Sequence, residues 1–567
     1  MKFERLKKFA LRHKEKIFFL LVSLLIVGPL LKPGFVLTLD MIFTPNMTFV
    51  FPPVSGVYNQ VPLDGILYII SKIIPADVLQ KVILVGIFYF IPAIFHKFLS
   101  LFGKKQTSLV KIAASILYLF NPFVYSRFMA GHWTFLVGYA LLPLIVYHVY
   151  KFLTYDKLDK EFYKQLLLLN LTAIVSVIFS VHHFFFLLII FAIASIVTII
   201  QKQKNVPRKI LLLFLPFLAV NLFWIIPTIT AEKFHSFGND ELQLFATSPD
   251  ESLGVIGNLL TFYGFWAEKT LFLLPKTSVP FWPLTFFFLY IPAVLSFLVI
   301  SIYKKGFKKL LGNPILIALI ILSVIGFILS FGSFSIGKII FEILYIKFPL
   351  LGAFREPQKF LSLFIFAFSI LFYLGLKFWS EEMEREKLDQ IKGLSPKEEK
   401  KILSILSKII PFGYIILIFA LTYQLFWGGF GQLKSVAYPD SWSELQKTAE
   451  AKESILVLPY QSYATFEFNN RRIANPAPEY FDSRVVSKQT LDETEDNLRR
   501  CDVAFEDGVC LMSYNSSVVW SETLKKESVD YVLLNKNDDW GSYKIVLVEP
   551  QFSVITRDEF SYVFKVN

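Results

Sequence analysis

The stretch IFFLLVSLLIVGPLL at residues 17–31 decides the class of this protein. It contains no charged residue, and an uncharged apolar run of this length predicts a membrane span. The basic segment MKFERLKKFALRHKEK (1–16) before it resembles the n-region of a signal peptide, but no small-x-small cleavage site follows the run. We therefore expect an uncleaved first span. The segment KPGFVLTLD (32–40) comes next, so that one carboxylate, Asp40, lies just past the end of this span.

The composition is that of an integral membrane protein. Hydrophobic residues make up 54% of the 567 positions and charged residues only 18%, whereas soluble domains carry about 25% charged residues. The net charge is +12, but Lys and Arg gather in short loops between apolar runs, as membrane topology requires. The charge therefore indicates the lipid bilayer as partner and no nucleic acid. Two cysteines exclude a disulfide scaffold and a four-cysteine metal site.

Further apolar runs bring the predicted number of spans to about eleven, at roughly 17–25 residues per span. They lie at 82–101, 109–125, 134–150, 166–181, 184–200, 210–229, 281–302, 313–332, 359–376 and 407–427. The long run 166–200 is divided into a helical hairpin at His182-His183, and the run 109–125 ends near Asn121-Pro122 because proline disfavours helix at the preceding residue.

The distribution of Lys and Arg predicts the orientation. Basic residues concentrate in 1–16, 201–209, 303–309 and 377–402, which all lie on one side when the spans alternate. The positive-inside rule places this side, and the N-terminus, in the cytoplasm. We therefore expect a multi-pass protein of the plasma membrane with its C-terminus outside.

From about residue 430 the sequence reads as a soluble domain, so we divide the chain into a membrane domain, 1–429, and an extracytoplasmic domain, 430–567. Short segments rich in Val, Leu, Ile and Tyr predict strands, and SWSELQKTAEA predicts a helix, which together indicate an α/β or α+β domain. The strands are expected at 453–460, 529–535, 542–549 and 560–567, and the helix at 441–451. Cys501 and Cys510 in this domain form either a disulfide or two buried free thiols.

Two loops on the outer side have helical apolar periodicity of their own. In 62–75 the isoleucines fall on one face, which is typical of a helix that lies on the membrane surface. The segment 337–354 has the same character.

Ionisable residues collect at the outer ends of the predicted spans, where they are hard to explain by folding alone. The candidates are Asp40, Arg127, His132, His182, His183, Glu232, Arg355 and Glu356. Each also has a purely structural interpretation. Asp40 is then a helix cap, His132 forms an interfacial pair with Trp133, and the two adjacent histidines form a hairpin turn. The guanidinium of Arg355 is suited to clamp a phosphate, or else it contacts Glu356 or a lipid headgroup.

Several soluble-enzyme motifs are absent from the sequence. It contains no GxxxxGK[ST] phosphate loop, no HExxH helix and no GxSxG turn. We therefore expect that any substrate arrives through the membrane.

Three segments carry a resemblance to a known family. LYLFNPFVYSRFMAGHWTFLVGYALLPLIVY (117–147), FREPQKF (354–360) and the end of the chain, VDYVLLN (529–535) with FSVITRDEFSYVFKVN (552–567), resemble the GT-C class of membrane glycosyltransferases. The resemblance is to the group that includes the membrane part of mycobacterial arabinofuranosyltransferases and bacterial proteins proposed to glycosylate lipoteichoic acid.

The resemblance implies a hexosyl- or pentosyltransferase. In that class an acidic residue of the first outer loop is the general base or helps to hold a metal, and the donor is a sugar on a polyprenyl phosphate. Asp40 then matches the acidic position, and Arg355 is a candidate for the donor phosphate. The acceptor is an extracytoplasmic glycan, lipid or protein. Met41 and Ile42 follow Asp40 where a second acid is usual, so Mg²⁺ or Mn²⁺ at Asp40 stays open.

Two other functions remain in view. A transporter or flippase of a lipid-linked glycan predicts polar or broken helices at mid-membrane and internal repeats, whereas the inner halves of these spans are apolar. A non-catalytic scaffold with a glycan- or protein-binding outer domain requires no convergence of Asp40, His132 and Arg355. The spacing of these three side chains distinguishes the readings.

Overall fold

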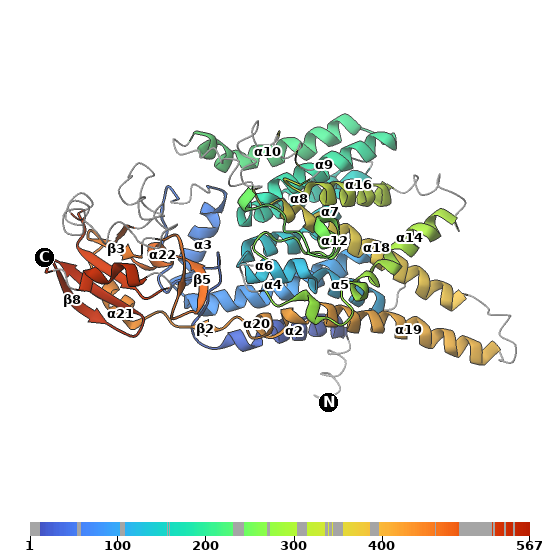
Figure 1. Cartoon of the computed structure of the whole chain (residues 1–567). Coiled ribbons are helices and arrows are strands. Elements are labelled where there is room, and N and C mark those ends of the chain that lie inside the picture. The colour runs from blue at the N-terminus through green and yellow to red at the C-terminus, as the bar shows by residue number, and fades with distance from the viewer. Residues whose placement is uncertain are drawn as a thin grey trace, which may run out of the picture.

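The computed structural model describes residues 12–53, 58–102, 108–155, 157, 159–230, 243–268, 273–302, 314–334, 338, 343, 355–385, 396–459, 461–486, 524, 528–537, 540–547 and 550–567. Long helices form one part of the molecule, and a smaller part built around strands lies at one end of them (Figure 1). Three sequence predictions lie outside or almost wholly outside these residues. They concern Glu232, the pair Cys501 and Cys510, and the surface helix at 337–354.

Eight helices in the described part of the chain are long and apolar enough to cross a membrane, so the prediction of a polytopic helical membrane protein is confirmed. They are Ala76–Phe102, Leu109–Met129, Trp133–Thr154, Lys160–Phe179, His182–Ile200, Val206–Thr230, Pro357–Ser380 and Ser404–Leu421. The other three predicted spans coincide with shorter apolar helices, α2 (Lys14–Val27), α14 (Tyr290–Ile302) and α16 (Pro314–Leu329). The count of eleven and the N-in orientation stay predictions.

The helix boundaries follow local sequence signals. α5 (Ser108–Leu119) ends before Asn121, whose side chain accepts a hydrogen bond from the Val124 amide at 3.0 Å and so caps α6 (Pro122–Met129). The predicted break at Asn121-Pro122 is thus confirmed, and α5 and α6 are the two parts of the span Leu109–Met129. The hairpin at His182 is confirmed as well. The remaining long helices are α4 (Ala76–Phe98), α7 (Trp133–Thr154), α8 (Lys160–Phe179), α9 (His182–Ile200), α10 (Val206–Thr230), α18 (Leu361–Arg385) and α19 (Pro396–Leu421).

α18 is the central helix of the bundle. In an apolar stretch of 18 residues within the span Pro357–Ser380, which includes most of α18, 94% of the residues are buried inside the protein. The corresponding share for α10 is 22%. It packs against α5, α14, α16 and α19. The residues that begin α18 therefore lie deep in the bundle, at the end that faces the C-terminal domain. We call this end the domain-facing end.

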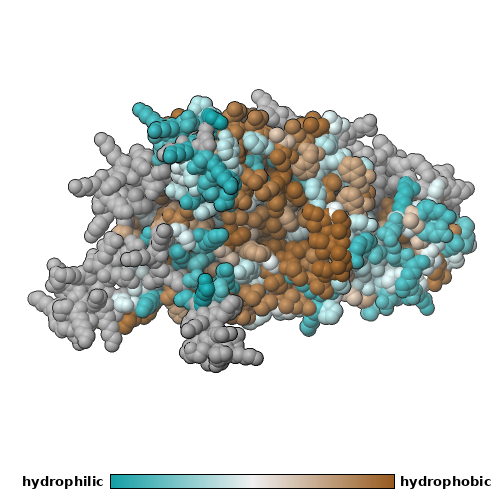
Figure 2. Space-filling model, turned by 180° about the vertical axis from the view of Figure 1, so that it is seen from behind, coloured by the Kyte–Doolittle hydropathy of each residue, from teal (hydrophilic) through white to brown (hydrophobic). Residues whose placement is uncertain are grey.

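Apolar side chains also cover the outside of the bundle. Figure 2 shows a broad apolar band across the rear of the molecule, and a largely hydrophilic C-terminal domain beside it. On α10 the side chains of Leu211, Leu215, Ile226 and Ile229 are exposed. A band of this kind suits contact with lipid acyl chains.

The C-terminal domain is built around one mixed sheet of five strands, ordered β6-β3-β7-β9-β8. The strands are β3 (Ser454–Leu458), β6 (Arg484–Val486), β7 (Tyr531–Asn535), β8 (Phe552–Arg557) and β9 (Ser561–Val566). β3 pairs in parallel with β6 and β7, and β9 runs antiparallel to β7 and β8. The predicted helix is present as α21 (Asp440–Thr448), and the α/β character is confirmed.

One predicted strand is wrong. Residues 542–549 were expected to be extended, but Trp540–Leu547 is a 3₁₀ helix. Tyr543 and Val546 are buried in the domain core, and a spacing of three residues places them on the same face of a 3₁₀ helix. This burial explains the apolar pattern without a strand.

Short strands join the two parts of the molecule. β1 (Phe35–Val36), after the first helix, pairs antiparallel with β2 (Ser435–Val436). A separate hairpin, β4 (Tyr463–Phe466) with β5 (Arg471–Ala474), reaches the loop that carries Asp40. The helix predicted at 62–75 is present as α3 (Val61–Ser71), with Ile66 and Ile69 exposed, and its place on the membrane surface stays a prediction.

Candidate functional site

Asp40 lies in a tight turn that is pinned to the connection between α6 and α7. The Met41 amide donates to the Thr38 carbonyl at 2.7 Å, and the Asp40 amide donates to the Ala130 carbonyl at 3.3 Å. Leu39, inside this turn, has a φ of +33°, a strained value for a residue with a branched side chain. Strain that is held in place by surrounding contacts is common at functional sites. The turn thus presents Asp40 in one fixed direction.

The Asp40 carboxylate has two polar partners and an open side. His132 Nε2 lies 3.1 Å from Oδ2, and the Tyr463 hydroxyl donates to Oδ1 at 2.8 Å. The side chain is 41% exposed. Partial burial favours a raised pKa for Asp40, but the hydrogen bonds from His132 and Tyr463 outweigh burial and lower this pKa. Asp40 is therefore ionised at neutral pH and reachable from outside.

The protonation of His132 follows from its neighbours. Arg127 Nη1 lies 3.2 Å from His132 Nδ1, and because a guanidinium only donates, Nδ1 must accept. The ring proton is then on Nε2, where it is donated to Asp40. Burial lowers the pKa of His132, although the nearby carboxylates act against this effect. His132 is thus a neutral donor that orients the Asp40 carboxylate.

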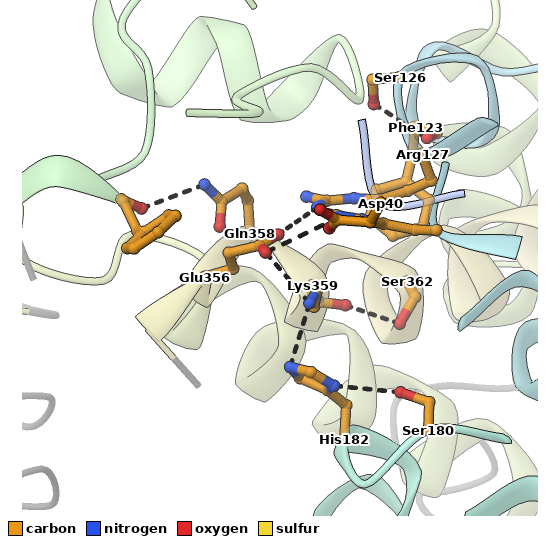
Figure 3. Close-up of polar contacts among 12 residues, drawn as sticks. Asp40, Phe123, Ser126, Arg127, Ser180, His182, Glu356, Gln358, Lys359 and Ser362 are labelled. Carbon is orange, nitrogen blue, oxygen red and sulfur yellow. Dashed lines mark hydrogen bonds and ion pairs between the residues drawn. The ribbon is translucent and has the colours of Figure 1, made fainter. Parts of the chain in front are cut away.

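A buried ion cluster of Arg127, Glu356 and Lys359 (Figure 3) adjoins His132, whose Nε2 lies 3.9 Å from Glu356 Oε1. Arg127 Nη1 is 2.6 Å from Glu356 Oε2, and Lys359 Nζ is 3.2 Å from Glu356 Oε1. Burial favours a raised pKa for Glu356, but Lys359 and Arg127 outweigh it and hold this pKa well below the usual range. Phe265 covers the guanidinium of Arg127, with its ring centroid 4.6 Å away. Each buried charge is therefore paired, as burial requires.

The cluster continues to the turn between α8 and α9. Lys359 Nζ lies 3.2 Å from His182 Nε2, and the Ser180 hydroxyl lies 3.1 Å from His182 Nδ1 (Figure 3). An ammonium only donates, so Nε2 of His182 accepts and its Nδ1 carries the proton. A continuous polar path thus runs from Asp40 through the starts of α7, α18 and α9.

The structure brings together five of the sequence candidates at the domain-facing end, namely Asp40, Arg127, His132, His182 and Glu356. His183 is not among them, since its ring packs between Phe135 and Phe186 at centroid distances of 5.0 and 5.4 Å. Arg355 lies at the edge, where its guanidinium stacks on Phe245 at 4.5 Å. Its positive charge acts to lower the pKa of Tyr463, the residue whose hydroxyl donates to Asp40.

Sequence reasoning missed two residues of this site. Lys359 stands three positions after Glu356 in FREPQKF, and a lysine at the start of an apolar span is itself a signal of a functional site. Tyr463 offers no such signal, because it stands 423 positions from Asp40 in an ordinary strand of the other domain.

The donor set near Asp40 does not fit a divalent cation. Both Glu356 oxygens bond to Arg127 and Lys359, and both His132 nitrogens are engaged. Asp40 is then the one carboxylate of the cluster that faces the open side. The described part of the chain contains no group of three or more His, Cys, Asp or Glu side chains arranged to hold a metal.

Solved structures show what the fold is similar to. The chain superposes with a TM-score of 0.56 on the arabinofuranosyltransferase AftD from Mycobacteria, at 11% identity, over 98% of this chain and 40% of that one. Two structures of a mutant of that protein match with a TM-score of 0.52, at 12% and 11% identity, over 98% of this chain and 42% and 41% of theirs. No protein-family model and no curated protein sequence matches the chain.

The expected fold resemblance to a GT-C membrane glycosyltransferase is confirmed by these matches. At this level of identity the likeness concerns the fold alone. The chain spans about two fifths of the length of the arabinofuranosyltransferase structures that it matches.

Proposed function

We propose that this protein is a membrane glycosyltransferase that moves a sugar from a polyprenyl-phosphate donor to a hydroxyl of an extracytoplasmic glycan, lipid or protein. The observation that carries the proposal is the state of Asp40. Its carboxylate is ionised and 41% exposed, and His132 orients it through the hydrogen bond from Nε2 to Oδ2. A positioned, ionised carboxylate at the end of a lipid-facing bundle is suited to act as a general base toward a hydroxyl.

The chemistry requires a base and a positive partner. In a direct displacement the acceptor oxygen forms a bond to C1 of the sugar, and its proton passes to the Asp40 carboxylate. The bond between C1 and the phosphate oxygen breaks, and the electron pair leaves with the polyprenyl phosphate. Attack from the side opposite to the phosphate inverts the configuration at C1. Arg355, which lies at the edge of the site and near Tyr463, is the group proposed to receive the leaving phosphate.

The orientation proposed from the sequence agrees with this assignment. Asp40 lies at the domain-facing end, and the basic segments 201–209 and 303–309 follow helix ends on the alternate side of the predicted topology. With the basic segments in the cytoplasm, the site opens to the outer leaflet. A polyprenyl-phosphate sugar in that leaflet reaches it from the lipid.

The test uses purified full-length protein in liposomes supplied with labelled polyprenyl-phosphate sugars. We expect transfer to an added acceptor, or slow hydrolysis that releases the polyprenyl phosphate. Asp40→Asn should lower the rate by roughly 10²- to 10⁴-fold. The matched control is Asp440→Asn, which alters an exposed carboxylate of the C-terminal domain. Full activity in Asp40→Asn contradicts the assignment of the base, and translocation of the lipid without chemical change indicates a flippase instead.

A further inference from the structure

The C-terminal domain contributes one side chain to the candidate base. Tyr463 of β4 donates its hydroxyl to Asp40 Oδ1 at 2.8 Å. The other carboxylate oxygen, Oδ2, faces the buried His132 ring. Apart from this contact, the cluster around Asp40 consists of residues from the helical part of the chain.

Main-chain hydrogen bonds hold Tyr463 in this place. Tyr463 pairs with Ala474 across the β4–β5 hairpin. The Ala474 amide donates to the Leu39 carbonyl at 2.8 Å, and the Leu39 amide donates to the Arg472 carbonyl at 3.2 Å. Because Leu39 directly precedes Asp40, these hydrogen bonds fix the position of the β4–β5 hairpin relative to Asp40. The contact between Tyr463 and Asp40 is therefore built into the junction of the two domains.

The Tyr463 hydroxyl occupies the oxygen that an acceptor needs. Oδ2 is directed at His132, so Oδ1 on the open side is the oxygen that an incoming hydroxyl reaches, and Tyr463 fills one of its two acceptor positions. Both Asp40 and Tyr463 are partly exposed there, with side-chain exposure of 41% for Asp40 and residue exposure of 38% for Tyr463. Burial raises the pKa of Tyr463, and the adjacent carboxylate acts in the same direction. The phenol thus stays protonated and presents an O–H donor, as an alcohol would.

We propose that the Tyr463 hydroxyl holds the place of the acceptor hydroxyl on Asp40, and that a hydroxyl-bearing acceptor binds by displacing it. Tyr463 is then a specificity-determining residue, and the β4–β5 hairpin is the element that selects which acceptors reach the base. This inference rests on the proposed glycosyl transfer. It also gives the C-terminal domain a defined task, since an acceptor must move or replace a side chain of that domain before the base is available.

The first test compares Tyr463→Phe with the unaltered protein in the transfer reaction. Without the competing hydroxyl, the KM for the acceptor should fall about threefold to tenfold, the range of one hydrogen bond. The acid limb of kcat/KM should move to higher pH, because Asp40 loses a hydrogen bond that lowers its pKa. A lower kcat with an unchanged KM overturns the proposal, since it makes Tyr463 a proton carrier. Unchanged constants and pH profile also overturn it.

The second test requires no sugar donor, so it separates this inference from the proposed function. Carboxylates of the purified full-length protein are labelled with a water-soluble carbodiimide and an amine, and labelling at Asp40 is followed by mass spectrometry with exposed Asp440 as reference. Asp40 should react several-fold faster in Tyr463→Phe. The control is Tyr562→Phe in β9, where the ring stacks on Lys536, and it should leave the labelling of Asp40 unchanged.

The two outcomes are distinct. Faster labelling of Asp40 in Tyr463→Phe without any glycosyl transfer supports the inference that the Tyr463 hydroxyl blocks Asp40, and it contradicts the proposed function. Transfer with unchanged labelling of Asp40 overturns the role of Tyr463 and leaves the proposed function standing.

Discussion

Arg127 Nη1 lies 2.6 Å from Glu356 Oε2, although the two residues are 229 positions apart in the chain. The pair joins the end of α6 to the segment that begins the central helix α18, and both side chains are buried. Arg127 also donates to His132, which in turn orients Asp40. The ion pair therefore supports the candidate base as well as the helix bundle.

Removal of one partner should destabilise the protein strongly. Glu356→Gln leaves the buried Arg127 and Lys359 without their shared counter-charge, and Arg127→Met leaves Glu356 with Lys359 alone. Breaking a buried ion pair by removing one partner costs about 3 to 5 kcal/mol. Reversible unfolding in mixed detergent micelles measures this loss. The matched control, Lys452→Met, breaks an exposed ion pair to Glu450 and should leave the unfolding curve unchanged. If Lys452→Met lowers the free energy of unfolding as much as Arg127→Met or Glu356→Gln does, the stabilising role of the buried ion pair is contradicted.

The stability of the bundle should depend on pH through Glu356. Its pKa is lowered in the folded protein, compared with about 4.3 for an unperturbed glutamate. The stabilisation is therefore complete above the unfolded value and is lost as the pH falls through the folded value. Unfolding followed between neutral and acidic pH should show a decline that Glu356→Gln reduces. If the stability of Glu356→Gln declines with acid as much as that of the unaltered protein, other groups cause the acid sensitivity.

His132 should set the pH at which the base becomes active. His132→Phe removes the donor to Asp40 Oδ2, so the pKa of Asp40 rises and the acid limb of kcat/KM moves to higher pH. We expect kcat/KM at neutral pH to fall roughly tenfold to hundredfold, as for a hydrogen bond to a charged group. His132→Gln, whose amide also donates, should recover part of the loss. A pH profile unchanged in His132→Phe argues against the orienting role.

Gly131 should tolerate no side chain. Its φ is +75°, and an added Cβ meets the Thr38 carbonyl and the Met41 amide of the turn that holds Asp40. Gly131→Ala therefore displaces this turn and costs about 1 to 2 kcal/mol for the left-handed conformation alone. Transfer activity and thermal unfolding should both decline. Gly413→Ala in α19 is the control, because nothing lies within 4 Å of its added Cβ, and there stability should stay the same or rise.

Local patterns predicted the helical part well. The apolar runs, the break at Asn121-Pro122 and the turn at His182 coincide with helix ends, since proline, capping side chains and long apolar runs act over a few residues. Three spans correspond to shorter helices than expected. In the C-terminal domain, the apolar pattern around Tyr543 suits a 3₁₀ helix as well as a strand, and only packing against the core distinguishes them.

The sequence by itself determined that the chain is a membrane protein with a soluble C-terminal part, and that ionisable residues stand at span ends. Those properties depend on composition and short-range periodicity. Only the tertiary structure decided which of these residues meet. It paired Arg127 with Glu356, placed His183 among aromatic rings and brought Tyr463 to Asp40. Such contacts join elements hundreds of positions apart, and they depend on how α6, α18 and the β4–β5 hairpin pack, which no local pattern encodes.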